Sequence, residues 1–261
     1  MCRLFACMAA GDVELEVSLL DAPRQFHARG HTNPDGWGLG FFANGQPELR
    51  KHDLPAKGEF LPENAVERAS AKLLMGHVRR ASRAPRAVRN CHPFTHEGWL
   101  FAHNGALFPL LEKWVRSRVG AVKYEGHTES EAIFRWILKN IEQTGRPEEG
   151  IREAVKPMIA DGQFSSLNFL LARQNALYAF RYATRSVDYY SLYYLERPAG
   201  GELEAASQDV HSKLQTRGLA EHPSVLVASE ALTPEPWKAL RLGELLSVRE
   251  DLKTEVLGLV S

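Results

Sequence analysis

The second residue of the chain, Cys2, is the first candidate for chemistry. A cysteine at this position is small enough that the initiator methionine, Met1, is normally removed, which would make Cys2 the N-terminal residue. Such a residue carries a nucleophile and a base together, because its α-amine, with a pKa of about 7.7–8.0, can accept the thiol proton at neutral pH. The alternative is an ordinary small residue at the start of a strand, so the rest of the sequence must decide.

Four short motifs follow Cys2 in a fixed order. They are Asn33-Pro34-Asp35-Gly36-Trp37-Gly38, Gly76-His77-Val78-Arg79, His103-Asn104-Gly105 and Thr128-Glu129-Ser130-Glu131. Each alone has a simpler interpretation, since Asn-Gly is typical of a turn, an arginine of a surface ion pair and a first-turn glutamate of a helix start. Their occurrence together behind an N-terminal cysteine is a far rarer coincidence, and it favours a catalytic site.

Other residues allow a metal site or a phosphate site as alternatives. Four histidines and Cys91 fall between residues 77 and 103, and His92 and His96 have the spacing that places two imidazoles on one helix face. Pro93 argues against a helix there, and no Cys-x-x-Cys pair accompanies the run, so we expect no metal. Five arginines lie in the segment 79–89, and we expect a solvated loop over the active site rather than a nucleic-acid patch.

The sequence predicts strands and helices that position these motifs. A capping-box pattern at Thr128 and apolar residues at helical spacing predict a helix over Glu129–Gln143. Weaker patterns predict helices over Glu14–Ala28, Pro62–Ala71, Leu107–Arg118 and Pro147–Ala160. Short runs of β-branched, aromatic and aliphatic residues predict ten strands, and a layered α+β sandwich follows. The strand runs are Arg3–Ala9, Trp37–Phe42, Leu73–Arg79, Trp99–His103, Leu167–Leu171, Ala176–Tyr182, Tyr189–Leu195, Val225–Ser229, Leu245–Arg249 and Thr254–Leu257.

Composition limits the class of protein. The 261 residues include 44% hydrophobic and 25% charged residues, as in an ordinary globular protein of one domain or two joined ones. The 32 basic residues balance 32 acidic ones, so no net field favours nucleic acid or an anionic membrane. Three cysteines and no signal-peptide pattern lead us to expect a reduced, cytoplasmic protein.

Taken together, the motifs resemble the class II glutamine amidotransferases, which are N-terminal-nucleophile (Ntn) hydrolases. The family fold is a four-layer αββα sandwich of two antiparallel sheets. The opening Met1-Cys2-Arg3-Leu4-Phe5, the segment Asp35–Gly38 and the late stretch Val227–Thr233 are similar to the free-standing, YafJ-like branch, which includes the γ-glutamyl amidase of ergothioneine synthesis. The resemblance runs nearly end to end, which implies a single amidotransferase domain over residues 1–261.

The resemblance implies a reaction and assigns its catalytic residues. Cys2 would attack the γ-amide of glutamine or of a γ-glutamyl compound and form a thioester, releasing ammonia or an amine. The Asn104 side-chain amide and the Gly105 backbone N–H would form the oxyanion hole. A glycine at 105 allows its N–H to face the substrate without a side chain in the way.

The resemblance also implies residues that bind and support. Arg79 would hold the substrate α-carboxylate, with the Ser82 hydroxyl assisting, and the planar guanidinium suits that bidentate contact. Glu129 would meet the α-ammonium group, although the family usually has aspartate there. Asp35 and Gly36 would support the loop of the nucleophile.

The family implies a small-molecule substrate and no cofactor. Two enzyme functions stay open: hydrolysis by the chain alone, or release of ammonia to a separate synthase subunit. Association with a partner subunit or into a homo-oligomer is also open. The non-enzyme alternative is a metal-binding or regulatory module that keeps the fold with a silent site.

Overall fold

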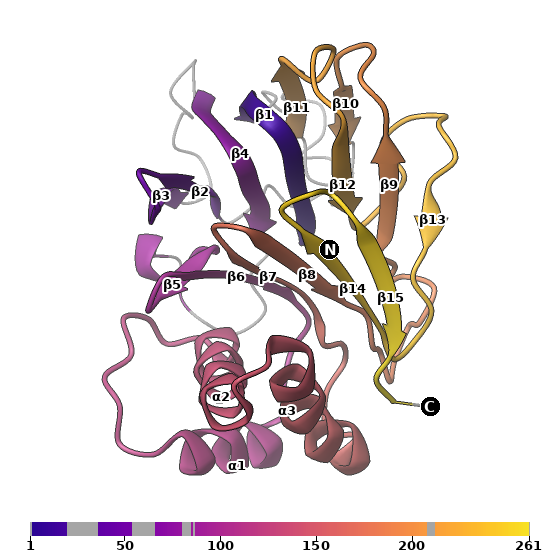
Figure 1. Ribbon diagram of the computed structural model, residues 1–261. Coiled ribbons are helices and arrows are strands. Elements are labelled where there is room, and N and C mark those ends of the chain that lie inside the picture. Colours follow the sequence, from indigo (N-terminus) through magenta and orange to yellow (C-terminus); the bar gives the residue numbers. More distant parts are fainter. Residues whose placement is uncertain are drawn as a thin grey trace, which may run out of the picture.

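Two antiparallel β-sheets face each other in the computed structural model, which describes residues 2–19, 36–53, 66–79, 85, 87–207 and 212–260 (Figure 1). In spatial order, the larger sheet contains β13 (Lys238–Ala239), β9 (Tyr193–Arg197), β12 (Ser224–Ala228), β1 (Arg3–Leu19), β4 (Val66–Arg79), β2 (Gly36–Ala43) and β3 (Gln46–Asp53). Strand β11 (Ser212–Arg217) also pairs with β1 and carries β10 (Glu204–Ser207). The smaller sheet contains β15 (Thr254–Gly258), β14 (Glu244–Arg249), β8 (Ala176–Phe180), β7 (Asn168–Arg173), β6 (Trp99–Asn104) and β5 (Phe94–His96).

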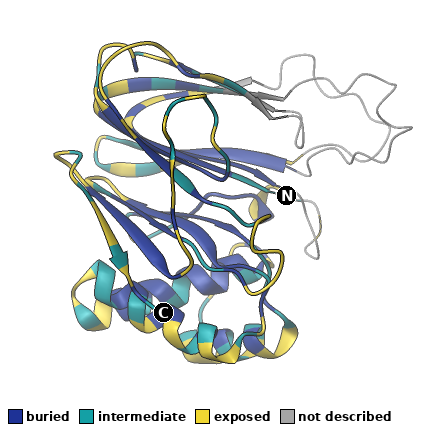
Figure 2. Ribbon diagram, turned by 90° about the vertical axis from the view of Figure 1, so that its right-hand side faces the viewer, coloured by how far each residue is buried: buried dark blue, intermediate teal, exposed yellow. Residues whose placement is uncertain are grey.

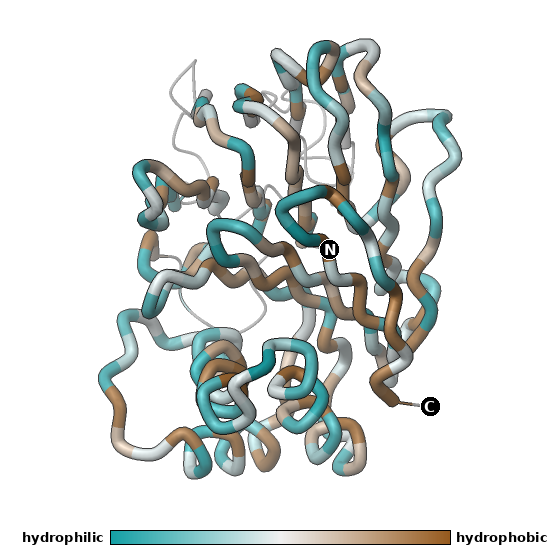
Figure 3. Tube along the Cα trace, in the orientation of Figure 1, coloured by the Kyte–Doolittle hydropathy of each residue, from teal (hydrophilic) through white to brown (hydrophobic). Residues whose placement is uncertain are grey.

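A layer of aliphatic side chains joins the two sheets. Along β1, Leu4, Ala6 and Met8 pack with residues of the smaller sheet such as Leu170 and Leu246. The intervening residues of β1 belong to a second buried cluster on the other face of the larger sheet. Because both faces of this first part of the strand are buried, residues 4–9 form a continuous apolar run, whereas Asp12, Glu14 and Glu16 interrupt the pattern further along. Hydrophobic residues are similarly concentrated along the strands of the smaller sheet (Figure 3).

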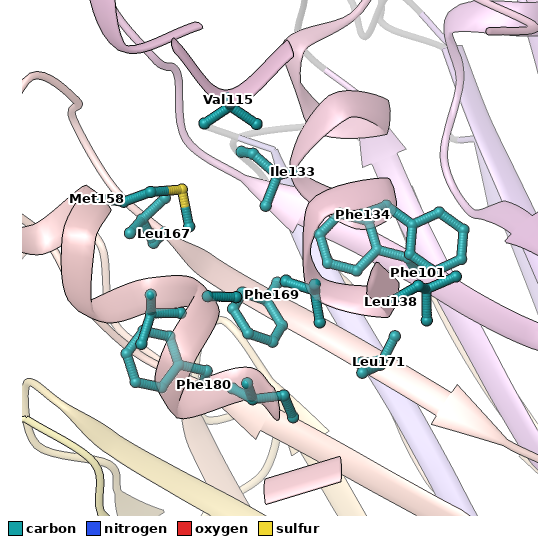
Figure 4. Close-up of a cluster of buried hydrophobic side chains, with 14 of the residues drawn as sticks. Phe101, Val115, Ile133, Phe134, Leu138, Met158, Leu167, Phe169, Leu171 and Phe180 are labelled. Atoms are coloured by element: carbon teal, nitrogen blue, oxygen red, sulfur yellow. The ribbon is translucent and has the colours of Figure 1, made fainter. Parts of the chain in front are cut away.

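Three helices cover the outer face of the smaller sheet: α1 (Pro109–Val119), α2 (Glu129–Thr144) and α3 (Pro147–Asp161) (Figure 1). Their apolar sides meet the sheet in one cluster, in which the Phe101 ring of β6 stacks on the Phe134 ring of α2 with centroids 5.0 Å apart (Figure 4). Figure 2 shows exposed residues on the outward sides of these helices and buried residues along the strands. The described residues therefore form an α+β sandwich of two antiparallel sheets with helices on the smaller sheet, which are three of the four layers that the family resemblance implies.

The predicted helices were correct in three cases and wrong in two. Helices α1, α2 and α3 match the predictions over Leu107–Arg118, Glu129–Gln143 and Pro147–Ala160. In contrast, Glu14–Leu19 is the second half of β1, and Val66–Ala71 is the first half of β4. These two halves pair with each other, and β11 pairs with β1 on its other side, so sheet pairing overrides the local helical pattern. The remaining residues of both predicted helices lie outside the described part of the chain.

The predicted strands all have counterparts, with one late start. The run predicted over Tyr189–Leu195 begins as β9 only at Tyr193, since Tyr189 and Tyr190 lie in a turn after Ser186. Five strands were not predicted, namely β3, β5, β10, β11 and β13. These strands are short or rich in polar residues, as in the alternately exposed sequence of β3. In the described part of the chain, no helix is long and apolar enough to cross a membrane.

Candidate active site

The first residues of β1 meet the ends of two neighbouring strands. Arg3 pairs with Val78 of β4, and Arg79, which follows Val78, pairs with Gly36 at the start of β2. Continuing the β1–β4 register by one residue places Cys2 opposite Arg79. The sheet therefore brings Cys2 together with two of the four motifs, which are far apart in the sequence, at one end of three adjacent strands.

The second sheet reaches the same place through Asn104, the last residue of β6. The Asn104 side-chain amide donates a hydrogen bond from Nδ2 to the Cys2 carbonyl oxygen, with a donor–acceptor distance of 3.1 Å. Asn104 is buried, with 2% of its surface exposed, whereas Cys2 is half-buried. The side-chain amide to which the resemblance assigns an oxyanion-hole role is thus in direct contact with the predicted nucleophilic residue.

Gly105 is held in a conformation and in a space that suit only glycine. Its φ angle is +153°, and a Cβ atom there would lie 2.0 Å from the Ser166 carbonyl oxygen. The next residues are fixed to the segment before β7: the Ala106 N–H donates to Ser165 Oγ at 3.0 Å, and the Phe108 N–H donates to the Gln163 carbonyl at 2.8 Å. These contacts fix the direction of the backbone that follows Asn104.

His103 connects this loop to helix α2. Its Nδ1 accepts a hydrogen bond from Ser130 Oγ at 3.0 Å, and its Nε2 donates to the Ser166 carbonyl at 3.2 Å. Burial lowers the pKa of His103 to about 4, so the imidazole is neutral at physiological pH and can both accept and donate. Glu129 directly precedes Ser130 in the first turn of α2 and is half-buried. The helix start that carries Glu129 is therefore docked next to Asn104.

The predicted capping box at the start of α2 forms in part. Thr128 Oγ1 accepts the Glu131 backbone N–H at 3.3 Å, as an N-cap residue should. The Glu131 carboxylate reaches further back and accepts the N–H groups of Glu125 and Gly126, at 2.7 and 2.9 Å. This arrangement fixes the loop that leads into α2 as well as the helix start itself.

A neutral imidazole cluster lies beside Arg79. The rings of His77 and His92 have centroids 4.3 Å apart, and both residues are buried. Burial, with the nearby Arg79 charge as a smaller cause, lowers the pKa of His77 to about 3. Burial also holds the pKa of His92 well below its ordinary value. Among the described residues, no group of histidine, cysteine, aspartate and glutamate side chains is arranged to hold a metal ion.

Three predicted site residues remain, and Gly36 is the one that the structure describes. Gly36 has a φ angle of +154°, and a Cβ atom there would lie 2.4 Å from Cys91 Sγ, so the backbone passes close against that thiol. Asp35 and Ser82 lie outside the described residues. Ser130 and Ser166 hold the His103 ring, and neither role was predicted. The sequence offered only two signals: Ser130 lies next to Glu129, and Ser166 lies just before a predicted strand.

A pocket of about 310 Å³ opens elsewhere, between β5, helix α2 and the loop before it. Aromatic side chains and charged groups from these three elements form its wall, and none of the predicted site residues lines it. The lining residues are Phe94, Thr95, His96, Lys123, Tyr124, Glu125, Glu131, Phe134 and Arg135.

Comparison with known proteins identifies the family. The model of the class II glutamine amidotransferases matches residues 1–257. The chain is 27% identical over 233 residues to the putative glutamine amidotransferase YafJ of Escherichia coli K12, covering 82% of this chain and 86% of YafJ. It is 28% identical over 117 residues to the gamma-glutamyl-hercynylcysteine sulfoxide hydrolase of Mycobacterium tuberculosis, covering 41% of this chain and 50% of that protein.

A solved structure agrees with this assignment at the level of the fold. The crystal structure of a predicted glutamine amidotransferase from Pseudomonas aeruginosa superposes with a TM-score of 0.74 at 22% sequence identity, covering 97% of this chain and 98% of that one. The family match spans almost the whole sequence, including all four motifs and Cys2. The chain belongs to the class II glutamine amidotransferases, a family of enzymes.

Proposed function

We propose that this protein hydrolyses the γ-amide of glutamine or of a γ-glutamyl compound, with Cys2 as the nucleophile after removal of Met1. The observation that carries the proposal is the 3.1 Å contact between Asn104 Nδ2 and the Cys2 carbonyl oxygen. An amide donor next to the nucleophilic residue is what acyl transfer needs, because the tetrahedral intermediate develops negative charge beside the attacking atom.

In the proposed reaction, the Cys2 α-amine accepts the thiol proton and Sγ attacks the amide carbonyl carbon. The carbonyl oxygen becomes an oxyanion, which accepts hydrogen bonds from Asn104 Nδ2 and the Gly105 backbone N–H. Loss of one such donor typically lowers kcat by about 10²–10³. The intermediate collapses, the C–N bond breaks, and the proton on the α-amine passes to the departing ammonia or amine. Water then attacks the thioester, with the α-amine accepting its proton, and releases the acid and the thiol.

Charged groups around the nucleophile suit the amino-acid end of the substrate. Arg79 is buried at the end of β4, in the position opposite Cys2, and would hold the α-carboxylate together with Ser82. Glu129, at the docked start of α2, would hold the α-ammonium group. Asp35 and Gly36 would support this end of β2, where Gly36 pairs with Arg79. The site would thus recognise a γ-glutamyl group by both of its charges.

One relative supports hydrolysis of a specific γ-glutamyl compound by the chain alone. One similar protein, from Mycobacterium tuberculosis, is named as a hydrolase of a γ-glutamyl conjugate. Such an enzyme releases its leaving amine to solvent. An ammonia-donating subunit would instead hydrolyse glutamine itself, with higher turnover in the presence of its synthase partner.

The test is turnover by protein from which Met1 has been removed, compared with Cys2→Ala. Glutamine and a panel of γ-glutamyl amides and dipeptides are assayed for released ammonia or amine. We expect turnover of at least one of these by the processed protein and none by Cys2→Ala. Equal turnover by both forms would overturn the proposal.

A further inference from the structure

A turn after β12 holds the first residues of β1. The Leu4 N–H donates to Ser229 Oγ at 2.9 Å, and the Ser229 N–H donates to the Leu4 carbonyl at 3.0 Å. Ser229 is buried, with 2% of its surface exposed. Its own carbonyl accepts a hydrogen bond from Ser191 Oγ at 2.8 Å, so a third segment fixes the turn. The backbone two residues after the proposed nucleophile is therefore held by a reciprocal pair of hydrogen bonds.

The next residue of the turn forms an ion pair with the residue beside Cys2. Arg3 Nε lies 2.7 Å from Glu230 Oε1, and the Arg3 side chain is only 14% exposed. The contact continues the β1–β12 register, in which Phe5 pairs with Ala228. The Glu230 side chain is 38% exposed, so the arginine is the buried partner, and a partly buried Arg–carboxylate contact fixes geometry better than a fully solvated ion pair does.

Together, these contacts restrain Cys2 from two sides. Asn104 holds its carbonyl from the smaller sheet, while Ser229 and Glu230 hold the two residues that follow it in the larger sheet. The first residues of a chain usually fray unless such contacts tie them down. A reactive thiol at the chain end needs this restraint, because misplacement of a reacting group by about 1 Å can cost about 10² in rate.

We infer that Ser229 and Glu230, the positioning turn, set the place of the thiol and α-amine of Cys2 against Asn104 and Gly105. This inference rests on the proposed function and deepens it. Neither residue touches the substrate; they act through Arg3 and Leu4. The sequence singled out this stretch as part of the family resemblance, and the contacts with β1 give it a physical purpose.

The test replaces Glu230, which pairs with Arg3 of β1. Its control replaces the acidic residue of a second ion pair made by β1. Glu16, at the other end of β1, pairs with Arg68 Nε at the same 2.7 Å distance. For Glu230→Gln we expect about a tenfold or greater fall in kcat with little change in KM, since only the reacting atoms are displaced. Glu16→Gln should leave both constants unchanged. In the reversed pair Arg3→Glu with Glu230→Arg, kcat should recover relative to each single reversal.

A second readout does not depend on turnover. Hydrogen exchange at the backbone amides of residues 3–5 should be faster in Glu230→Gln than in Glu16→Gln. The inference would be overturned if Glu230→Gln showed the same exchange and kcat as Glu16→Gln, or if it changed only KM. Either result would leave the proposed function intact. Absence of turnover in the unaltered, processed protein would overturn the proposed function, and the inference with it.

Discussion

At the scale of single residues, the proposed site separates the tasks of binding and reaction. Arg79 and Glu129 carry the charges that suit an amino-acid substrate, while Cys2, Asn104 and Gly105 carry the groups for acyl transfer. Among the described contacts of these five residues, the one between Asn104 and Cys2 joins atoms across the two sheets directly. The proposed binding roles of Arg79 and Glu129 can therefore be tested separately from the reaction at Cys2.

Glu129 provides that test. Glu129→Gln removes the negative charge but keeps the size of the side chain, so kcat/KM should fall much more for substrates with an α-amine than for deaminated analogues. The control is Glu142→Gln, an exposed position near the other end of α2, which should leave both kinds of substrate unaffected. Equal losses for the two substrate kinds would show that another group meets the ammonium.

At the scale of elements, the strands and helices around the proposed site were predicted correctly where the local pattern and the tertiary role agree. The first residues of β1, the last residues of β4 and most of β6 are apolar because both of their faces are buried, and α2 has a capping residue and a regular apolar face. The edge strand β3 has four charged residues and only two apolar ones, Pro47 and Leu49, so its sequence carries no clear strand signal. The second half of β1 was mistaken for a helix because its partner β11 lies about two hundred residues away.

The same contrast applies to the proposed site, where candidate residues could be named from the sequence but their contacts could not. The family resemblance pointed to Cys2, Arg79, Asn104 and Glu129, but no local pattern could show that an Asn104 amide would contact a residue 102 positions earlier. Nor could it reveal the buried contacts of His103 with Ser130 and Ser166, which exist only once the loop and the helix have been packed. The contacts that position the site residues therefore join distant parts of the sequence, and no local pattern reveals them.

Gly105 tests the loop between β6 and α1. In Gly105→Ala the added Cβ atom would overlap the Ser166 carbonyl, so both kcat and the thermal midpoint should fall. Gly98→Ala is the matched control, since Gly98 has a φ angle of +78° and a Cβ atom there would meet no neighbouring group within 4 Å. It should lose only about 1–2 kcal/mol of stability from backbone strain and keep its activity. Equal effects of the two substitutions would show that contact with Ser166 is unimportant.

At the scale of the whole molecule, the two sheets enclose neutral histidines next to the proposed site. The pKa values of His77 and His103 are lowered by burial to about 3 and about 4, from an ordinary value of 6.5. Each histidine therefore binds a proton more readily in the unfolded chain. Their neutral burial contributes stability that is complete above pH 6.5 and is lost as the pH falls toward the folded-state values.

This coupling predicts a steep loss of stability in mild acid. Each histidine contributes a slope of up to about 1.4 kcal/mol per pH unit in the free energy of unfolding between these pKa values. Urea unfolding from about pH 7 to about pH 5 should show a smaller slope for His77→Gln than for the unaltered protein. His127→Gln, at an exposed position in the loop before α2, is the control. An unchanged slope in His77→Gln would contradict the buried neutral state.

The central claim, that the thiol of Cys2 carries the acyl group, is tested most directly by mass spectrometry. Protein lacking Met1 is mixed with a γ-glutamyl substrate, stopped with acid during turnover and digested. We expect a γ-glutamyl adduct on the peptide that begins with Cys2, and none on the buried Cys7 or Cys91, nor on protein that retains Met1. Amide hydrolysis with the adduct on another residue, or undiminished hydrolysis by Cys2→Ala, would contradict the claim.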